Sequence, residues 1–268
     1  MSYLDHFSLK EAPFSKEIED KDLWLPSSKQ VIVDELIEAL EEHSSVLLVG
    51  DPGTGKTCVL RALRHRLPAE GFRLTYCHNA TLGRRDFYRQ LCLALGLSPS
   101  ATAASVFFAV AQHVEDLGKE RTHPVFLLDE AHLLHQDTLD HLHILLNYEW
   151  DKRALLSLVL VGLPEMEDRI ARRRNRSLHS RLGRRLRIDP LTPEDTREYL
   201  AHRLALAGCP TNLFASDVIT MLHEVTEGSM RDVDRLATAA MRSAARKKKR
   251  LIERDVMAHV IEAESPRT

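Results

Sequence analysis

The chain has 268 residues, enough for one large domain or two small ones, and its formal net charge of −2 excludes a global basic excess that would draw it to nucleic acid. Its four cysteines lack C-x-x-C spacing, which argues against a disulfide framework and predicts reduced thiols in a cytoplasmic protein. The first residues lack the pattern of a signal peptide and no apolar run approaches membrane-spanning length, so we expect no membrane partner.

Residues 1–30 mix aromatic and apolar side chains with charges, which predicts an irregular arm packed against the body of the protein. Two interpretations of Pro13 and Phe14 remain open. They cover the adenine ring of a nucleotide, or they are core residues, as buried apolar side chains usually are. The helical spacing of apolar residues over 30–42 predicts an amphipathic helix with an acidic outer face.

The stretch 50–57 matches the phosphate-binding pattern G-x-x-x-x-G-K-[ST] at every fixed position. An apolar run at 46–49 predicts the buried strand that should precede it, and helical spacing over 58–67 predicts the helix that should follow. In such a loop, backbone N–H groups form a nest for phosphate oxygens at the positive end of a helix. Lys56 would reach the β- and γ-phosphates as a catalytic residue, and the Thr57 hydroxyl would hold Mg²⁺. The predicted nucleotide-binding residues here are Gly50, Asp51, Pro52, Gly53, Thr54, Gly55, Lys56, Thr57 and Cys58.

A second strand is predicted at 72–77, followed by helices at 84–95 and 103–117. The apolar run 125–128 then leads directly into Asp129 and Glu130, the Walker B pattern. Because a buried parallel strand presents its carboxyl end to ligands, we expect Asp129 to hold Mg²⁺ through water and Glu130 to polarise the attacking water. The alternative is an acidic N-terminus for a helix that begins near residue 131.

Residues 129–132 also spell the DEAH helicase box, but a helicase of that type needs a second nucleotide domain, and only one P-loop is present. Four histidines follow within a short stretch. No carboxylate or cysteine completes a tetrahedral set with them at helical spacing, so we expect solvated or capping side chains and no zinc site. These histidines are His132, His135, His141 and His143.

A fourth strand is predicted at 155–162, and a short last strand at 186–188. Between them runs an arginine-rich stretch, which is typical of a solvated or partner-facing surface, although one arginine could act in trans on a neighbour's γ-phosphate. Beyond Pro190 the pattern is helical. The expected helices cover 194–207, 216–226, 229–246 and 253–263, with a basic turn at 246–250. We therefore expect an N-terminal arm (1–30), an α/β core with a parallel sheet flanked by helices (31–190) and a small all-α lid (191–268).

A P-loop domain followed by a helical lid resembles an AAA+ ATPase, and more narrowly the GspA/ExeA-type ATPases and the related origin-recognition-like AAA group. The resemblance covers nearly the whole chain and implies a P-loop NTPase fold, ATP and Mg²⁺ as cofactors, and ATP hydrolysis. The segments that carry it are Tyr3–Phe7, Ala12–Phe14, Gly50–Thr57, Val125–His132, Val159–Glu165 and Gly228–Arg231.

The resemblance also implies roles for single residues outside the P-loop. Arg231 matches the sensor-2 arginine that reaches the nucleotide from the lid. Arg181 best matches the arginine finger, with Arg176 as runner-up. Asn79 lies where a polar residue restrains the catalytic glutamate. The chain departs from the family at Leu163, where a polar sensor-1 residue is usual, and this departure implies slow hydrolysis stimulated by assembly.

As a stand-alone ATPase, the chain looks like the transposon helper ATPases of the MuB, TnsC, IstB and TniB type. This resemblance implies a homo-oligomer that assembles with ATP on duplex DNA, takes part in target selection and recruits a transposase. Arg84, Arg85, Lys119 and Arg121 would contact DNA phosphates, with solvated helix ends as the alternative. Two other functions stay open: a secretion- or envelope-linked ATPase that acts on protein, and a nucleotide-held scaffold with negligible turnover, which Leu163 motivates.

Overall fold

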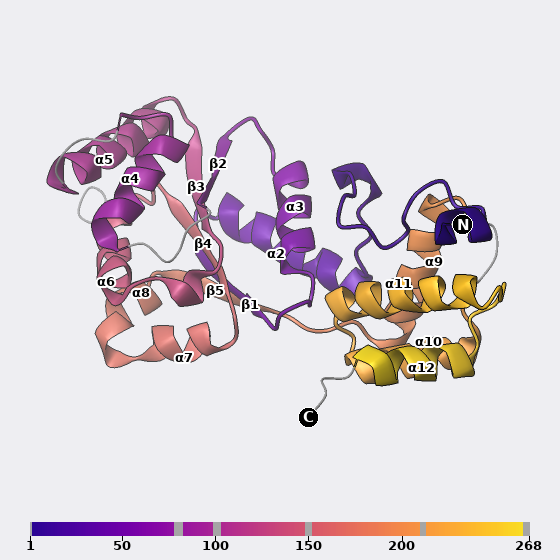
Figure 1. The fold of residues 1–268 in the computed structure, drawn as a ribbon. Coiled ribbons are helices and arrows are strands. Elements are labelled where there is room, and N and C mark those ends of the chain that lie inside the picture. Colours follow the sequence, from indigo (N-terminus) through magenta and orange to yellow (C-terminus); the bar gives the residue numbers. More distant parts are fainter. Residues whose placement is uncertain (1, 78–82, 99–102, 148–151, 210–212, 265–268) are drawn as a thin grey trace. The chain divides into compact units, whose positions relative to one another are not determined.

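The computed structural model describes residues 2–77, 83–98, 103–147, 152–209 and 213–264 (Figure 1). Packing divides the chain into two compact units, and each is described by itself. The sheet unit contains residues 27–51 and 59–188. The helical unit contains residues 1–26, 52–58 and 189–268. The tip of the P-loop, from Pro52 to Cys58, therefore packs with the arm and the C-terminal helices.

The sheet unit is built on five parallel strands in the order β2-β3-β4-β1-β5, which confirms the predicted parallel sheet. Every residue of β1, β3 and β4 is buried, as expected for apolar strands covered on both faces. The strands are β1 (Ser45–Gly50), β2 (Phe72–Cys77), β3 (His123–Leu128), β4 (Ser157–Gly162) and β5 (Leu182–Ile188).

Helices cover both faces of this sheet, with α2 and α3 on one face and α4, α5 and α6 on the other (Figure 1). Alternate strand residues such as Phe126, Leu128 and Leu160 form one buried cluster with the second group of helices, because side chains of a strand alternate between its two faces. The helices here are α2 (Ser27–Glu41), α3 (Lys56–Arg66), α4 (Arg84–Ala94), α5 (Ala103–Lys119), α6 (Gln136–Leu145), α7 (Glu165–Ala171) and α8 (Arg176–His179).

The helical unit holds four longer helices around a second buried cluster, which confirms a C-terminal helical region. These are α9 (Pro193–Leu206), α10 (Ser216–Thr226), α11 (Met230–Arg246) and α12 (Arg254–Glu264). A capping box of Thr192 and Asp195 starts α9, as the sequence predicts. Among the described residues, no helix has both the length and the apolar character needed to cross a membrane.

Two local predictions, for the arm and for the segment after β3, were wrong. The arm is not wholly irregular, because a capping box formed by Ser2 and Asp5 starts the short helix α1 (Tyr3–Phe7). The helix expected near residue 131 is a single 3₁₀ turn (Ala131–Leu133), and α6 begins only at Gln136. The left-handed backbone of Glu130 (φ 53°) turns the chain sharply at the end of β3, so an α-helix does not follow directly.

The arm is tied to α9 by a buried arginine. Arg203 donates from Nε to the carbonyl oxygen of Pro13 (2.6 Å) and from Nη2 to that of Ser15. Phe14 lies in the buried cluster of the helical unit, with its ring edge-on to Phe214. This burial is what the packing interpretation of Phe14 expects, and contact of Pro13 and Phe14 with adenine stays a prediction.

Candidate nucleotide site

The P-loop joins the end of β1 to the start of α3 and depends on glycine for its shape. Gly53 and Gly55 have φ values of 83° and 95°, in a region that side chains other than glycine rarely adopt. Glycines in such conformations let successive N–H groups turn inward and form an anion-binding nest. α3 has 11 residues and begins at Lys56, so the positive end of a full helix lies at this loop.

A second helix begins at the same loop, within the helical unit. The backbone N–H of Met230, the first residue of α11, donates to the carbonyl oxygen of Gly53 at 2.9 Å. A Cβ at Gly53 would overlap Oγ of Ser229, the N-cap of α11, and would lie 3.3 Å from Cβ of Arg231. The structure thus brings the predicted sensor-2 arginine beside the P-loop, which the distance along the sequence does not reveal.

The Walker B carboxylates stand at the carboxyl end of β3, in the sheet unit. Both oxygens of Asp129 accept a hydrogen bond, one from the hydroxyl of Tyr76 (2.8 Å) and one from the backbone N–H of Glu130 (2.9 Å). Burial, and then the bond to Asp129, raise the pKa of Tyr76 well above its usual value, so the phenol keeps its proton and remains a donor. Tyr76 orients Asp129, and the sequence reasoning missed this residue.

Glu130 has a left-handed backbone, which costs a residue other than glycine about 1 kcal/mol or more. Its side chain is 54% exposed, and Nε2 of His132 lies 3.6 Å from its Oε2. The expectation of a solvated or capping His132 was wrong, since its side chain is only 11% exposed. In the part of the chain that the structure describes, no group of three or more His, Cys, Asp or Glu residues is arranged to hold a metal ion.

The arginine-rich stretch is mostly exposed, as expected for a solvated or partner-facing surface, but several of its members also bond to neighbouring elements of the sheet unit. Arg169 donates to the carbonyl oxygens of His132 and Leu134. Arg174 pairs with Asp140, and Arg184 pairs with two glutamates of α2. These arginines fasten neighbouring elements of the sheet unit to one another.

Arg181 directly precedes β5, so it lies at the amino edge of the parallel sheet, that is, the end at which the strands begin. Its Nη1 donates to the carbonyl oxygen of Ser177 at 3.2 Å. Asp129 and Glu130 lie at the opposite, carboxyl edge. A strand of six residues, such as β3, separates these edges by about 20 Å. Arg176, the runner-up, begins the short helix α8. Asn79 lies outside the described residues.

The four predicted DNA contacts do not form one surface. Arg84 and Arg85 open α4, after the carboxyl end of β2, and Arg84 bonds Nε2 of His141 (2.7 Å). Lys119 and Arg121 precede β3 at the amino edge, where Lys119 pairs with Asp116 (2.7 Å). The two basic pairs therefore lie at opposite edges of the sheet.

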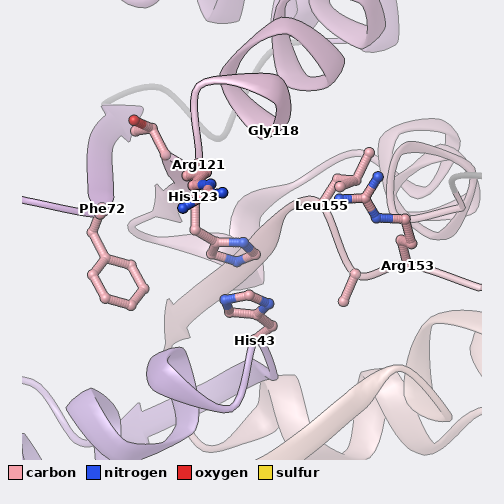
Figure 2. Close-up of a pocket in the computed structure, with 10 residues that line it drawn as sticks. His43, Phe72, Gly118, Arg121, His123, Arg153 and Leu155 are labelled. Carbon is pink, nitrogen blue, oxygen red and sulfur yellow. The ribbon is translucent and has the colours of Figure 1, made fainter.

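Arg121 lines a cavity of about 500 Å³ at the amino edge (Figure 2). The rings of His43 and His123 stack there with centroids 4.0 Å apart, and Arg153 lies across from them. Burial, and then the neighbouring His43, lower the pKa of His123 to about 4, so this ring is neutral at physiological pH. The described residues that line the cavity include two arginines and no carboxylates.

Comparisons with known proteins agree with the fold. A family model described as "AAA domain" matches residues 38–170. General secretion pathway protein A of Aeromonas hydrophila is 30% identical over 258 residues, which cover 95% of this chain but only 47% of that protein. The chain thus spans about half the length of this relative.

Solved structures show the same fold at low identity. Cdc6p from Pyrobaculum aerophilum aligns with a TM-score of 0.73 at 19% identity, over 94% of this chain and 70% of that one. The Aeropyrum pernix ORC1 protein, solved in complex with DNA, aligns with a TM-score of 0.65 at 21% identity, over 90% of this chain and 66% of that one. Together with the P-loop and the strand order, these matches identify the chain as one that carries an AAA domain and has the AAA+ fold of the P-loop NTPases.

Proposed function

We propose that the protein is an ATP-dependent AAA+ ATPase that oligomerises and binds duplex DNA as a transposition helper in the cytoplasm. The conformation of the P-loop is the observation that supports ATP binding. Gly53 and Gly55 take the backbone conformation of a phosphate nest, and the N-termini of α3 and α11 meet at this loop. This donor set fits the phosphates of ATP.

Within this proposal, the P-loop amides and Lys56 hold the β- and γ-phosphates, and Thr57 and Asp129 hold Mg²⁺. When bound, Mg²⁺ would supply positive charge that offsets the charge of the phosphates. Asp129 is suited to this role because its carboxylate is fixed by two donors. Glu130 is the proposed general base, and Arg231 the proposed lid contact to the nucleotide.

The position of Arg181 supports an assembled active form. Arg181 stands at the edge of the sheet opposite to Asp129 and Glu130, so it is poorly placed to serve the Walker B end of its own sheet. At the amino edge it can instead be offered to the nucleotide of a neighbouring copy. Hydrolysis would then depend on assembly, and Leu163 at the sensor-1 position agrees with slow basal turnover.

The arginine substitution tests this assignment. We expect Arg181→Ala to reduce ATP turnover by about 10³-fold and to leave ATP affinity unchanged. Arg176→Ala tests the runner-up, and Arg173→Ala is a matched control from an exposed position nearby. Full turnover by a monomer, with no effect of Arg181→Ala, would refute the arginine finger.

Support for DNA binding comes from the local basic pairs and from the fold shared with a protein solved on DNA. Affinity should fall steeply with salt, with a log–log slope of about 0.9 per phosphate contact. The double substitution of Arg84 and Arg85 by alanine should reduce that slope by about 2. Co-sedimentation with duplex DNA in the presence of ATP measures both quantities, and an adjacent transposase gene would support the partner.

A second function is favoured by one specific observation, the 30% identity to a general secretion pathway protein over 95% of the chain. Here the ATPase would act on protein at the cell envelope. Absence of DNA binding at low salt would favour this alternative. A third, an ATP-held scaffold, is favoured if Glu130→Gln and the wild type turn over ATP equally slowly.

A further inference from the structure

The sensor-1 position carries Leu163, so no polar side chain enters the site from the residue after β4. A polar side chain nevertheless stands at this place in the sheet unit. A Cβ at Gly162, the last residue of β4, would lie 3.2 Å from the backbone nitrogen of His132 and 3.5 Å from its Nδ1. The imidazole of His132 therefore packs against the carboxyl end of β4, where glycine leaves room for it.

The two nitrogens of this ring have different surroundings. Nδ1 is buried and has no hydrogen-bond partner among the described residues. Nε2 lies 3.6 Å from Oε2 of Glu130, beyond hydrogen-bond distance. An unpaired buried acceptor is tolerated better than an unpaired buried N–H, so the neutral ring should carry its proton on Nε2. The Nε2–H group then faces the carboxylate of Glu130.

The turn that carries the imidazole of His132 is fixed by hydrogen bonds, whereas the carboxylate of Glu130 is exposed. Arg169 of α7 donates to the carbonyl oxygens of His132 and Leu134, which fixes the 3₁₀ turn that carries the imidazole. Glu130 is 54% exposed and has room to rotate through the short distance to Nε2. A fixed donor beside a movable carboxylate can set the orientation of that carboxylate.

We propose that His132 is a positioning residue for ATP hydrolysis, whose Nε2–H donates to one oxygen of Glu130 and leaves the other for the attacking water. It supplies from the β3 side the polar group that residue 163 lacks. This inference rests on the proposed ATPase function and on Glu130 as the base.

The test is steady-state ATP turnover by the full chain, with ATP affinity measured by calorimetry. His132→Leu removes the donor, and we expect kcat to fall about tenfold at unchanged ATP affinity. His132→Gln can place an amide N–H close to the position of Nε2, and it should retain kcat within about threefold. His135→Leu is the control, since this exposed histidine makes no side-chain capping bond in α6.

The Glu130→Gln background separates the inference from the function. There, His132→Leu should produce no further loss, because the carboxylate it positions is gone. If Glu130→Gln abolishes turnover while His132→Leu does not lower kcat, the positioning role is overturned and the ATPase stands. Equal losses for the Leu and Gln variants, with a lower melting temperature in both, would also overturn it in favour of a packing role. Turnover by Glu130→Gln at the wild-type rate would overturn Glu130 as the general base, and the inference about His132 with it.

Discussion

Gly228 and Gly96 provide a matched test of why glycine precedes the N-cap of α11. Both residues have φ of 75°, so alanine costs each about 1–2 kcal/mol of backbone strain. Their surroundings differ. A Cβ at Gly96 meets nothing within 4 Å, whereas a Cβ at Gly228 would overlap the carbonyl oxygen of Leu191 and lie 2.9 Å from its nitrogen.

The overlap at Gly228 involves backbone, which cannot rotate away as a side chain can. Forced displacement of packed groups costs about 1–3 kcal/mol, and it endangers the 3.0 Å hydrogen bond from Leu191 N–H to the Gly228 carbonyl, worth about 1 kcal/mol. We therefore expect Gly228→Ala to lower the free energy of unfolding by about 3–6 kcal/mol, against about 1–2 kcal/mol for Gly96→Ala.

Urea denaturation followed by circular dichroism measures both values. Because Gly228 lies next to Ser229, which packs on Gly53, Gly228→Ala should also weaken ATP binding, and Gly96→Ala should not. Equal destabilisation by the two substitutions would refute the argument, since it would show that the approach of Leu191 is not what requires glycine.

Three further predictions concern hydrogen-bonded side chains. Tyr76→Phe leaves one oxygen of Asp129 without its donor, so the Mg²⁺ concentration for half-maximal turnover should rise about tenfold; an unchanged magnesium titration would contradict this. Burial raises the pKa of Asp234 to about 6, against 3.8 in the unfolded chain, so the folded state binds more protons between pH 6 and 4. The stability of the wild type relative to Asp234→Asn should therefore rise by about 3 kcal/mol as pH falls through this window, and a constant difference in urea midpoints would argue against it. In Arg203→Lys, the lysine cannot reach both carbonyl groups of the arm, so limited proteolysis should cut residues 8–26 sooner than in the wild type. Equal cleavage rates would show that Arg203 does not hold the arm against α9.

The sheet was predictable because its signals are local. Each of the three central strands, β1, β3 and β4, contains a contiguous apolar run, and the structure confirms these strands and the predicted β2. β5 was predicted too short, as 186–188 instead of Leu182–Ile188. It is an edge strand that contains three arginines, and Arg184 pairs with acids of α2, so its charges concealed its extent.

The site was predictable only where its residues are contiguous. The P-loop and the Walker B pair are short motifs with fixed spacing, so one sequence suffices to find them. Tyr76 was missed because its partner, Asp129, follows a different strand, and the burial of His132 against Gly162 of β4 was equally invisible in the sequence. Arg84 and Arg121 are separated because β2 and β3 run parallel: Arg84 follows the end of β2, and Arg121 precedes the start of β3.

The hydrogen bond between Met230 and Gly53 connects the phosphate loop to a stiff rod. α11 has 17 residues and so extends about 25 Å from the loop to Arg246. If the loop shifted when a phosphate group bound, α11 would tilt with it, and the displacement would increase along the helix. The far end, at residues 246–250, would then report on the phosphates without touching them. A spectroscopic label at Lys248 would register ATP uptake at a distance.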